Sequence, residues 1–330
     1  MRSLPLLVAV AVCTSSAFAG DPADPAALKT AITRWPRTSS RRTRSLGAPS
    51  TSALACHHSA PAVWAFREAK AKSLPVDETL LGELNKQLTE AGDGRFVAER
   101  PAGKPKALNS KALYFSLSLA QDPDPAAGSN DGTKLLLSTV IADQTDDGSW
   151  SAWPQTRPPI FPQTDECATV LETLSLLSAA AAGDANAIAA RDKGLAWLTG
   201  HTSDDDPQTT ALRVILWRKL DRPVAESQPW VALIRSRQNA DGGWSQASAM
   251  ASDAWATGQA LYALALAGAT GDDPVIARGQ QFLIATQRED GGWSMTSRPI
   301  KPGGEGSKNL VPIIGGGSAW AVLGLVRSGV

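Results

Sequence analysis

The sequence predicts an all-α fold, an α/α toroid of six helical hairpins, and two observations carry this prediction. A seven-residue motif that contains Gln, Asp, Gly and Trp occurs three times, at residues 144–150, 238–244 and 287–293. The apolar stretches between the copies are rich in Ala and Leu and poor in Val and Ile, which favours helix over strand. Internal repeats of this kind indicate an architecture of stacked, similar units. We call the seven-residue pattern the repeat motif.

The spacing of the copies indicates the size of one unit. Trp244 and Trp293 are 49 residues apart, and Trp150 and Trp244 are 94 residues apart, which is nearly two such periods. A degraded copy is therefore expected between them. Residues 193–198 repeat the segment at 278–283 that precedes the third copy. A period of about 50 residues fits one helical hairpin per unit.

Each residue type of the repeat motif has an expected structural role. The Gln is expected to end an outer helix and to bond the free carbonyl groups of its last turn. The Asp-Gly pair predicts a turn, because Gly adopts a positive φ without steric cost. The Trp is expected to pack against the adjacent hairpin and to use its N–H as a polar contact. The motif therefore joins hairpins and carries no chemistry of its own.

The helices predicted between the turns fall into two alternating sets. Helices rich in small residues can approach one another closely and suit an inner ring; they are expected at 59–72, 109–121, 164–181, 208–220, 252–269 and 316–328. Amphipathic helices suit an outer ring; they are expected at 26–35, 77–90, 134–144, 184–200, 228–238 and 274–287. Six hairpins that close into a ring need no capping repeats, which open solenoids require.

Composition and the N-terminus limit the class of protein. The 330 residues are 43% hydrophobic, enough for a large core, and the net charge of zero argues against nucleic acid as the main partner. A basic start, an apolar run and Ala17-Phe18-Ala19 predict a signal peptide over residues 1–19. A lipoprotein anchor at Cys13 is the alternative, although Val12 is bulky for that signal. No later stretch has the roughly 18 apolar residues of a membrane span. We expect a secreted or periplasmic protein.

The chain after the predicted signal peptide divides into two parts. Residues 20–58 are predicted to be an irregular N-terminal segment that includes the first outer helix. Its arginines between Arg34 and Arg44 are interpreted as a solvated loop, with an anion-binding patch as the alternative. Residues 59–330 are predicted to form the toroid.

The pattern Lys/Arg-Gly-x-x-aromatic-Leu followed by Gln-x-x-Asp-Gly-Gly-Trp resembles the repeat of squalene–hopene cyclases, oxidosqualene cyclases and protein prenyltransferase β subunits. Residues 278–293 match this pattern closely, and residues 229–244 match its second part. The resemblance covers most of residues 59–330 and implies a toroid with a central apolar cavity. It does not by itself imply catalysis, because one fold hosts many functions.

A catalytic acid is expected where an inner helix begins. In such a toroid the inner helices run the same way, so their N-termini meet at one mouth of the cavity. The resemblance to the cyclases implies an Asp at such a position, which protonates an alkene or epoxide. Asp165 and Glu166 are the candidate catalytic residues. Adjacent residues on a helix do not face each other, and a helix-capping role for Thr164 or Asp165 is the alternative.

Zinc is a candidate cofactor on a second resemblance. Protein prenyltransferases bind zinc through an Asp-x-Cys pair and a later His, and Asp165 with Cys167 matches the first two. His201, the only later His, lies outside an inner-helix start, so His57 or His58 would have to supply the third ligand. The alternative is a small buried Cys167 without metal.

The resemblance to the cyclases implies an apolar, isoprenoid-like ligand, and such chemistry needs a cavity whose aromatic faces stabilise carbocations. The candidate binding residues are His57, His58, Trp64, Tyr114, Trp217, Asp253, Trp255, Tyr262 and Trp320. We expect an exported protein that acts on or binds such a ligand, with acid-initiated cyclisation as the activity. The alternative is a non-catalytic toroid that binds a ligand or a protein. Full squalene cyclisation is not expected, because triterpene cyclases have two domains of this kind and this chain has one.

Overall fold

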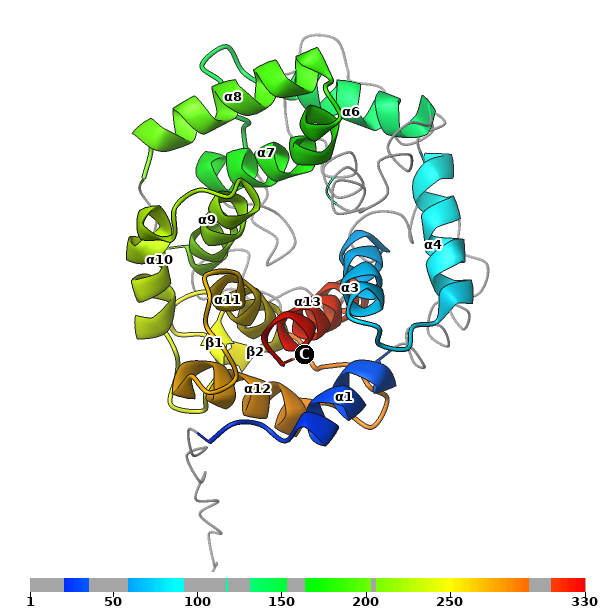
Figure 1. The fold of residues 1–330 in the computed structure, drawn as a ribbon, viewed down its shortest axis with the longest axis vertical. Helices are drawn as coiled ribbons and strands as arrows, with labels where there is room; N and C mark the ends of the chain where they lie inside the picture. The colour runs from blue at the N-terminus through cyan, green and yellow to red at the C-terminus, as the bar shows by residue number, and fades with distance from the viewer. Residues whose placement is uncertain are drawn as a thin grey trace, which may run out of the picture.

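The computed structural model describes residues 21–35, 59–91, 117, 131–152, 164–202, 206–296 and 310–329. In this part of the chain an outer layer of helices surrounds an inner layer (Figure 1). The outer helices are α1 (Pro25–Arg34), α4 (Glu78–Ala91), α6 (Asp131–Asp143), α8 (Ala185–Gly200), α10 (Val224–Ser236) and α12 (Pro274–Thr286). The inner helices are α3 (Ser59–Ala71), α7 (Asp165–Ala181), α9 (Pro207–Lys219), α11 (Ala254–Leu266) and α13 (Val311–Gly329). The predicted α/α toroid is confirmed.

Two short strands complete the described elements. Strand β1 (Trp244–Ser245) pairs antiparallel with β2 (Ser252–Asp253), and Trp244 lies opposite Asp253. The predicted inner helix at 109–121 lies outside the described residues except for Leu117. None of the described helices combines the length and the apolar character that crossing a membrane requires.

The first and last helices of the chain lie side by side, which closes the ring (Figure 1). The side-chain amide of Gln287, just after α12, donates to the carbonyl of Ala31 in α1 at 2.8 Å. The Gln281 amide donates to the carbonyl of Asp21 at 2.8 Å, just before α1. In the inner layer α3 packs against α13. The predicted closure is therefore confirmed.

In each intact repeat motif, the Trp side chain forms a hydrogen bond to the C-terminal turn of the preceding outer helix. The indole N–H donates to a carbonyl ten residues earlier, in the last turn of that helix: Trp150 to Val140 at 2.8 Å, Trp244 to Ile234 at 2.7 Å, and Trp293 to Leu283 at 2.8 Å. Carbonyls in the last turn of a helix lack the i+4 backbone N–H that would pair with them inside the helix. The sequence analysis assigned this task to the Gln, and that assignment is wrong.

The Gln of the motif instead connects two neighbouring outer helices. Its amide donates to a carbonyl of the next outer helix: Gln144 to Ala190, Gln238 to Val275 and Gln287 to Ala31, each at 2.8 Å. The same amide nitrogen donates to the carbonyl of the Gly in its own motif, at 2.8–2.9 Å. The Gln therefore ties its own turn to the following hairpin.

The Asp-Gly pair forms the predicted turn. In the second copy, Asp241 Oδ1 accepts from the backbone N–H of Gly243 at 3.0 Å, and Gly242 has φ of 86°. A Cβ atom on Gly242 would lie 2.7 Å from the Arg278 carbonyl oxygen in α12. Gly is therefore required here by its positive φ and by the close approach of the next outer helix.

The inner helices are rich in small residues because their backbones touch. A Cβ atom on Gly258 of α11 would lie 2.2 Å from the carbonyl oxygen of Trp320 in α13. A Cβ atom on Gly324 of α13 would lie 2.8 Å from the Gly258 carbonyl oxygen. Helix α13 begins at Val311, five residues before the predicted start, and continues through three consecutive glycines. Gly317, one of these, leaves room for the Met295 side chain.

Candidate functional site

Four aromatic side chains from three inner helices meet inside the ring. Trp64 comes from α3, Trp255 and Tyr262 from α11, and Trp320 from α13. The Trp64 ring lies edge-to-face with Tyr262 and with Trp320, with centroids 5.3 Å apart in both pairs. Trp255 and Trp320 are 6.3 Å apart. All four are at most 3% exposed. We call these residues the aromatic cluster; the structure brings together four of the predicted binding residues.

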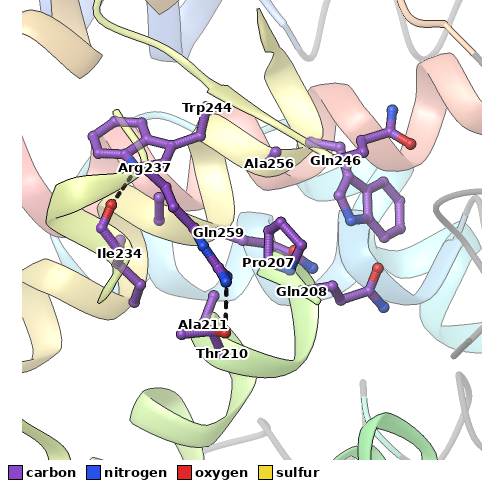
Figure 2. Close-up of a pocket in the computed structure, with 12 residues that line it drawn as sticks. Pro207, Gln208, Thr210, Ala211, Ile234, Arg237, Trp244, Gln246, Ala256 and Gln259 are labelled. Atoms are coloured by element: carbon purple, nitrogen blue, oxygen red, sulfur yellow. Dashed lines mark hydrogen bonds between the residues drawn. The ribbon is translucent and has the colours of Figure 1, made fainter. Parts of the chain in front are cut away.

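Two narrow clefts border the aromatic cluster. The central cleft lies among residues of α3, α7, α9, α11 and α13, and has a cavity volume of about 10 Å³; Trp64, Leu171, Gln208, Trp255, Gln259 and Trp320 line it. The side cleft lies between α9, α11 and the end of α10, with a volume of about 20 Å³ (Figure 2). Gln208, Trp255 and Gln259 line both clefts. These three residues therefore separate the two spaces.

One carboxylate forms hydrogen bonds with two members of the aromatic cluster. Glu68 of α3 accepts from the Tyr262 hydroxyl, and its Oε1 accepts from the Trp64 indole N–H at 3.3 Å. Arg327 Nη1 lies 3.9 Å from Glu68 Oε2. Burial raises the pKa of Tyr262 well above its ordinary value, and the negative charge of Glu68 raises it further. Lys219 Nζ lies 5.5 Å from the Trp64 ring centroid, and burial lowers the pKa of this lysine.

Asp165 lies at the exposed start of α7, outside the aromatic cluster. Its Oδ1 accepts from the backbone N–H of Ala152 at 2.6 Å, which connects α7 to the chain just after the first repeat motif. Thr164 caps α7, because its hydroxyl accepts from the Cys167 backbone N–H at 3.1 Å. The capping alternative therefore describes Thr164, while Asp165 bonds a neighbouring segment.

Glu166 points in another direction, toward the outer layer. It is 5% exposed and forms an ion pair with Arg213 of α9, which is 1% exposed. The Arg213 guanidinium also donates to the carbonyl of Leu198 at 3.2 Å. It lies 5.6 Å and 5.1 Å from the ring centroids of Trp217 and Trp230. The predicted binding residue Trp217 therefore belongs to this outward cluster and not to the aromatic cluster.

Two of the predicted zinc ligands, Asp165 and Cys167, lie on different sides of α7, and the third, His57, lies outside the described residues. Asp165 is exposed and Cys167 is fully buried, because residues two apart on a helix point to different sides. His201 is exposed and stacks on Trp197. Among the described residues, no three His, Cys, Asp or Glu side chains form a group that could hold a metal ion.

The remaining predicted site residues have other placements. Asp253 caps α11, because its Oδ1 accepts from the Ala256 backbone N–H at 2.9 Å. Its Oδ2 accepts from the side-chain amide of Gln246. His57, His58 and Tyr114 lie outside the described residues.

A buried carboxyl group on α7, Glu172, was not among the site residues predicted from the sequence. Glu172 is 1% exposed, and its Oε2 has no hydrogen-bond partner. Burial raises the pKa of Glu172 well above its ordinary value of 4.5, because a charged carboxylate would be poorly solvated there. The signal was present, since Glu172 is the single charge within the otherwise neutral run of residues 167–181. Burial therefore favours the protonated form of this carboxyl group.

The family-model match lies in the second half of the chain. The family model described as the squalene-hopene cyclase N-terminal domain matches residues 204–298. The squalene–hopene cyclase of Bradyrhizobium diazoefficiens is 26% identical over 202 residues. That region covers 51% of this chain and 30% of the relative, so the chain spans about a third of the relative's length.

Solved structures show the same fold at low sequence identity. The type II terpene cyclase MstE from Scytonema, in its apo form, has a TM-score of 0.57 and is 15% identical, covering 92% of this chain and 98% of that chain. A variant of MstE in complex with geranylgeranyl dihydroxybenzoate has a TM-score of 0.56 and is 13% identical, covering 92% and 97%. At these identities the likeness shows the fold alone.

Proposed function

We propose that the chain acts on an isoprenoid-like apolar ligand at the centre of the ring. The repeat, the family-model match over residues 204–298 and the fold shared with type II terpene cyclases support this proposal. The activity proposed is acid-initiated cyclisation. The observation that carries the proposal is the aromatic cluster, in which three indoles and one phenol from α3, α11 and α13 lie inside the inner layer.

The aromatic cluster has the chemistry that such a reaction needs. Protonation of a terminal C=C bond leaves a carbocation, which the next C=C bond attacks as a new carbon–carbon bond forms. Ring faces attract the moving positive charge, by about 0.5–2 kcal/mol for each ring, and Trp does so best. Loss of a proton to a base or capture of water then ends the reaction. The aromatic rings also exclude water from the earlier cations.

Glu172 is the described carboxyl group that fits the role of proton donor. An acid for this reaction must keep its proton at the working pH. Burial raises the pKa of Glu172, and one of its oxygens has no partner. Asp165 is exposed and bonded to Ala152, and Glu166 is paired with Arg213, so both are engaged in contacts that hold the fold. We therefore move the proposed acid from Asp165 to Glu172.

The experiment compares turnover in three versions of the purified protein. Wild type, Glu172→Gln and Asp165→Asn are incubated with squalene and with prenyl alcohols and diphosphates, and products are identified by gas chromatography and mass spectrometry. We expect cyclic products from wild type, a loss of about 100-fold or more with Glu172→Gln, and retained activity with Asp165→Asn. Full activity of Glu172→Gln would remove this residue as the acid. Loss confined to Asp165→Asn would restore the first assignment.

A non-catalytic binding toroid is the second candidate function. It is favoured by the structural contacts of Asp165 and Glu166, which engage both acids predicted from the sequence. It predicts that purified protein retains an isoprenoid lipid and converts none of the compounds tested. Extraction of the purified protein with organic solvent, followed by mass spectrometry, detects such a lipid.

Export and zinc are tested separately. We propose that residues 1–19 are removed on export, and fractionation of expressing cells checks whether the protein reaches the periplasm or the medium. Metal analysis of wild type and Cys167→Ser tests zinc binding. Near-zero zinc in both would end the zinc hypothesis.

A further inference from the structure

We infer that the isoprenoid ligand carries an uncharged hydroxyl group, which binds where the two clefts meet, between Trp255 and Gln208. The inference rests on the proposed function, because it names the polar group of the same ligand. Trp255 and Gln208 line both the central cleft and the side cleft. They therefore lie at the junction of the two clefts, where the polar end of a ligand could bind while its apolar chain occupies the central cleft.

The observation behind the inference is a group of buried polar atoms without partners. Trp255 is 1% exposed and its Nε1 has no hydrogen-bond partner. Gln208 is 4% exposed and its Oε1 has none. Gln246, which lines the side cleft and is 1% exposed, has an unpartnered Oε1 as well (Figure 2). Buried polar groups are normally paired, and leaving several unpaired at one place indicates a missing partner.

The orientation of Gln246 follows from its other contacts. Its Nε2 donates to the Asp253 carboxylate and, at 3.0 Å, to the Thr296 carbonyl. Both partners are acceptors, so the amide nitrogen faces them and the amide oxygen is the atom left without a partner. The clefts therefore present an indole donor together with an amide acceptor. A hydroxyl group matches this pair, because it donates one hydrogen bond and accepts others.

A diphosphate group fits the same place poorly. Proteins hold diphosphates with several Arg or Lys side chains or with metal ions. Arg237 is the one cationic side chain that lines the side cleft, and its Nη1 already donates to the Thr210 hydroxyl at 3.3 Å. The carboxylate of Asp253, bonded to Gln246, adds negative charge beside the cleft. The surroundings therefore favour a neutral polar group over an anionic one.

The experiment measures the affinity of three C20 ligands that differ at one end. Geranylgeraniol, its diphosphate and the corresponding hydrocarbon without oxygen are titrated into the purified protein, and binding is followed by quenching of tryptophan fluorescence. We expect the alcohol to bind at least ten-fold more tightly than either of the others. Gln208→Leu should weaken alcohol binding about ten-fold and leave hydrocarbon binding unchanged.

A matched control separates this site from a general effect of the substitution. Gln228 is exposed on the outer helix α10 and lines neither cleft, so Gln228→Leu makes the same chemical change and should alter neither affinity. Trp255→Phe removes the indole donor and retains an aromatic ring. It should also lower the preference for the alcohol. Thermal unfolding followed by circular dichroism shows whether each variant is folded. If Gln208→Leu does not fold, the affinities of Trp255→Phe test the hydroxyl assignment instead.

The outcomes distinguish this inference from the proposed function. If the alcohol and the hydrocarbon bind equally well, or both variants weaken both ligands equally, the hydroxyl assignment fails while isoprenoid binding stands. Tightest binding of the diphosphate also overturns the hydroxyl assignment. If none of the three ligands binds, both proposals fail. A structure of the alcohol complex in which a water molecule keeps the place between Trp255 and Gln208 would likewise overturn the inference.

Discussion

The indole of Trp244 lies directly against Gly279 of the next outer helix, where a Cβ atom would be 2.8 Å from the ring. Trp150 has the same relationship to Gly194, at 2.9 Å. The Gly that precedes one copy of the repeat motif therefore makes room for the Trp of the copy before it. The motif and its lead-in, which both recur along the sequence, therefore form a single contact between neighbouring hairpins.

This contact predicts the effect of adding a single methyl group. Gly279→Ala should lower the free energy of unfolding by about 1–3 kcal/mol, because neither the Trp244 ring nor Leu261, 2.9 Å from the added atom, has space to move. Urea unfolding measures the change. Gly82→Ala in α4 is the control: no atom lies within 4 Å of the added Cβ, so a gain of about 0.5–1 kcal/mol is expected. Equal effects at both positions would contradict the proposed contact.

The buried ion pair of Glu166 and Arg213 predicts an asymmetric mutational response. Arg213→Met leaves the Glu166 carboxylate buried without its cation and should cost about 3–5 kcal/mol. The double variant Glu166→Leu with Arg213→Met removes both charges and should be much closer to wild type. Urea unfolding of the variants checks this. Arg222→Met, which breaks the exposed pair with Glu226, should change stability by less than about 1 kcal/mol.

Glu172 predicts a stability that falls as pH rises. Burial raises the pKa of Glu172 in the folded protein above 4.5. The stability of the fold with a neutral Glu172 is therefore fully present below pH 4.5, and it is lost as pH rises through the folded pKa because the buried carboxyl group then becomes charged. Glu172→Gln stays neutral at every pH. It should therefore be more stable than wild type at pH 7–8, with a difference that shrinks toward pH 4.5. Urea unfolding between pH 4 and 8 measures this, and a difference independent of pH would refute it. The exposed Glu83→Gln is the control for loss of a surface charge.

Asp147 predicts the opposite pH dependence. A hydrogen bond from the Thr145 side chain, together with those from Ser149, lowers the pKa of Asp147 from 3.8 to about 2. The stability that this carboxylate contributes is therefore present above pH 3.8 and is lost as pH falls through about 2. Asp147→Asn should be less stable than wild type at pH 6, and the difference should narrow as pH is lowered toward 2. A difference that widens at low pH would argue against these hydrogen bonds.

Four of the aromatic residues that were predicted from the sequence to line the cavity come together in the structure, and Trp217 does not. Trp64, Trp255, Tyr262 and Trp320 were placed on inner helices and do meet inside the ring. Trp217 was expected with them, but α9 presents it to Trp230 of the outer layer, with centroids 5.0 Å apart. The helix was predicted, but its rotation about its own axis was not. That rotation depends on packing with both neighbouring layers.

The carboxyl groups show the same limit. Asp165 and Glu166 are adjacent in the sequence, yet one is exposed and bonded to Ala152, while the other is buried against Arg213, 47 residues further along the chain. No local pattern identifies a partner so distant. The motif Gln was also misassigned, because its acceptor lies 46 residues away in the next hairpin for Gln144.

By itself the sequence determined the repeating unit, the alternation of inner and outer helices and the turn that joins them. These depend on local chemistry, such as positive φ at Gly242 and an indole that bonds a carbonyl ten residues earlier. Only the tertiary structure decided which polar groups are paired and which are left unpaired at the clefts, as Trp255 and Gln208 are. Closure of the ring fixes the rotation of each inner helix about its own axis and the helices that it packs against. This constraint depends on contacts between residues from both ends of the chain, which no local pattern contains.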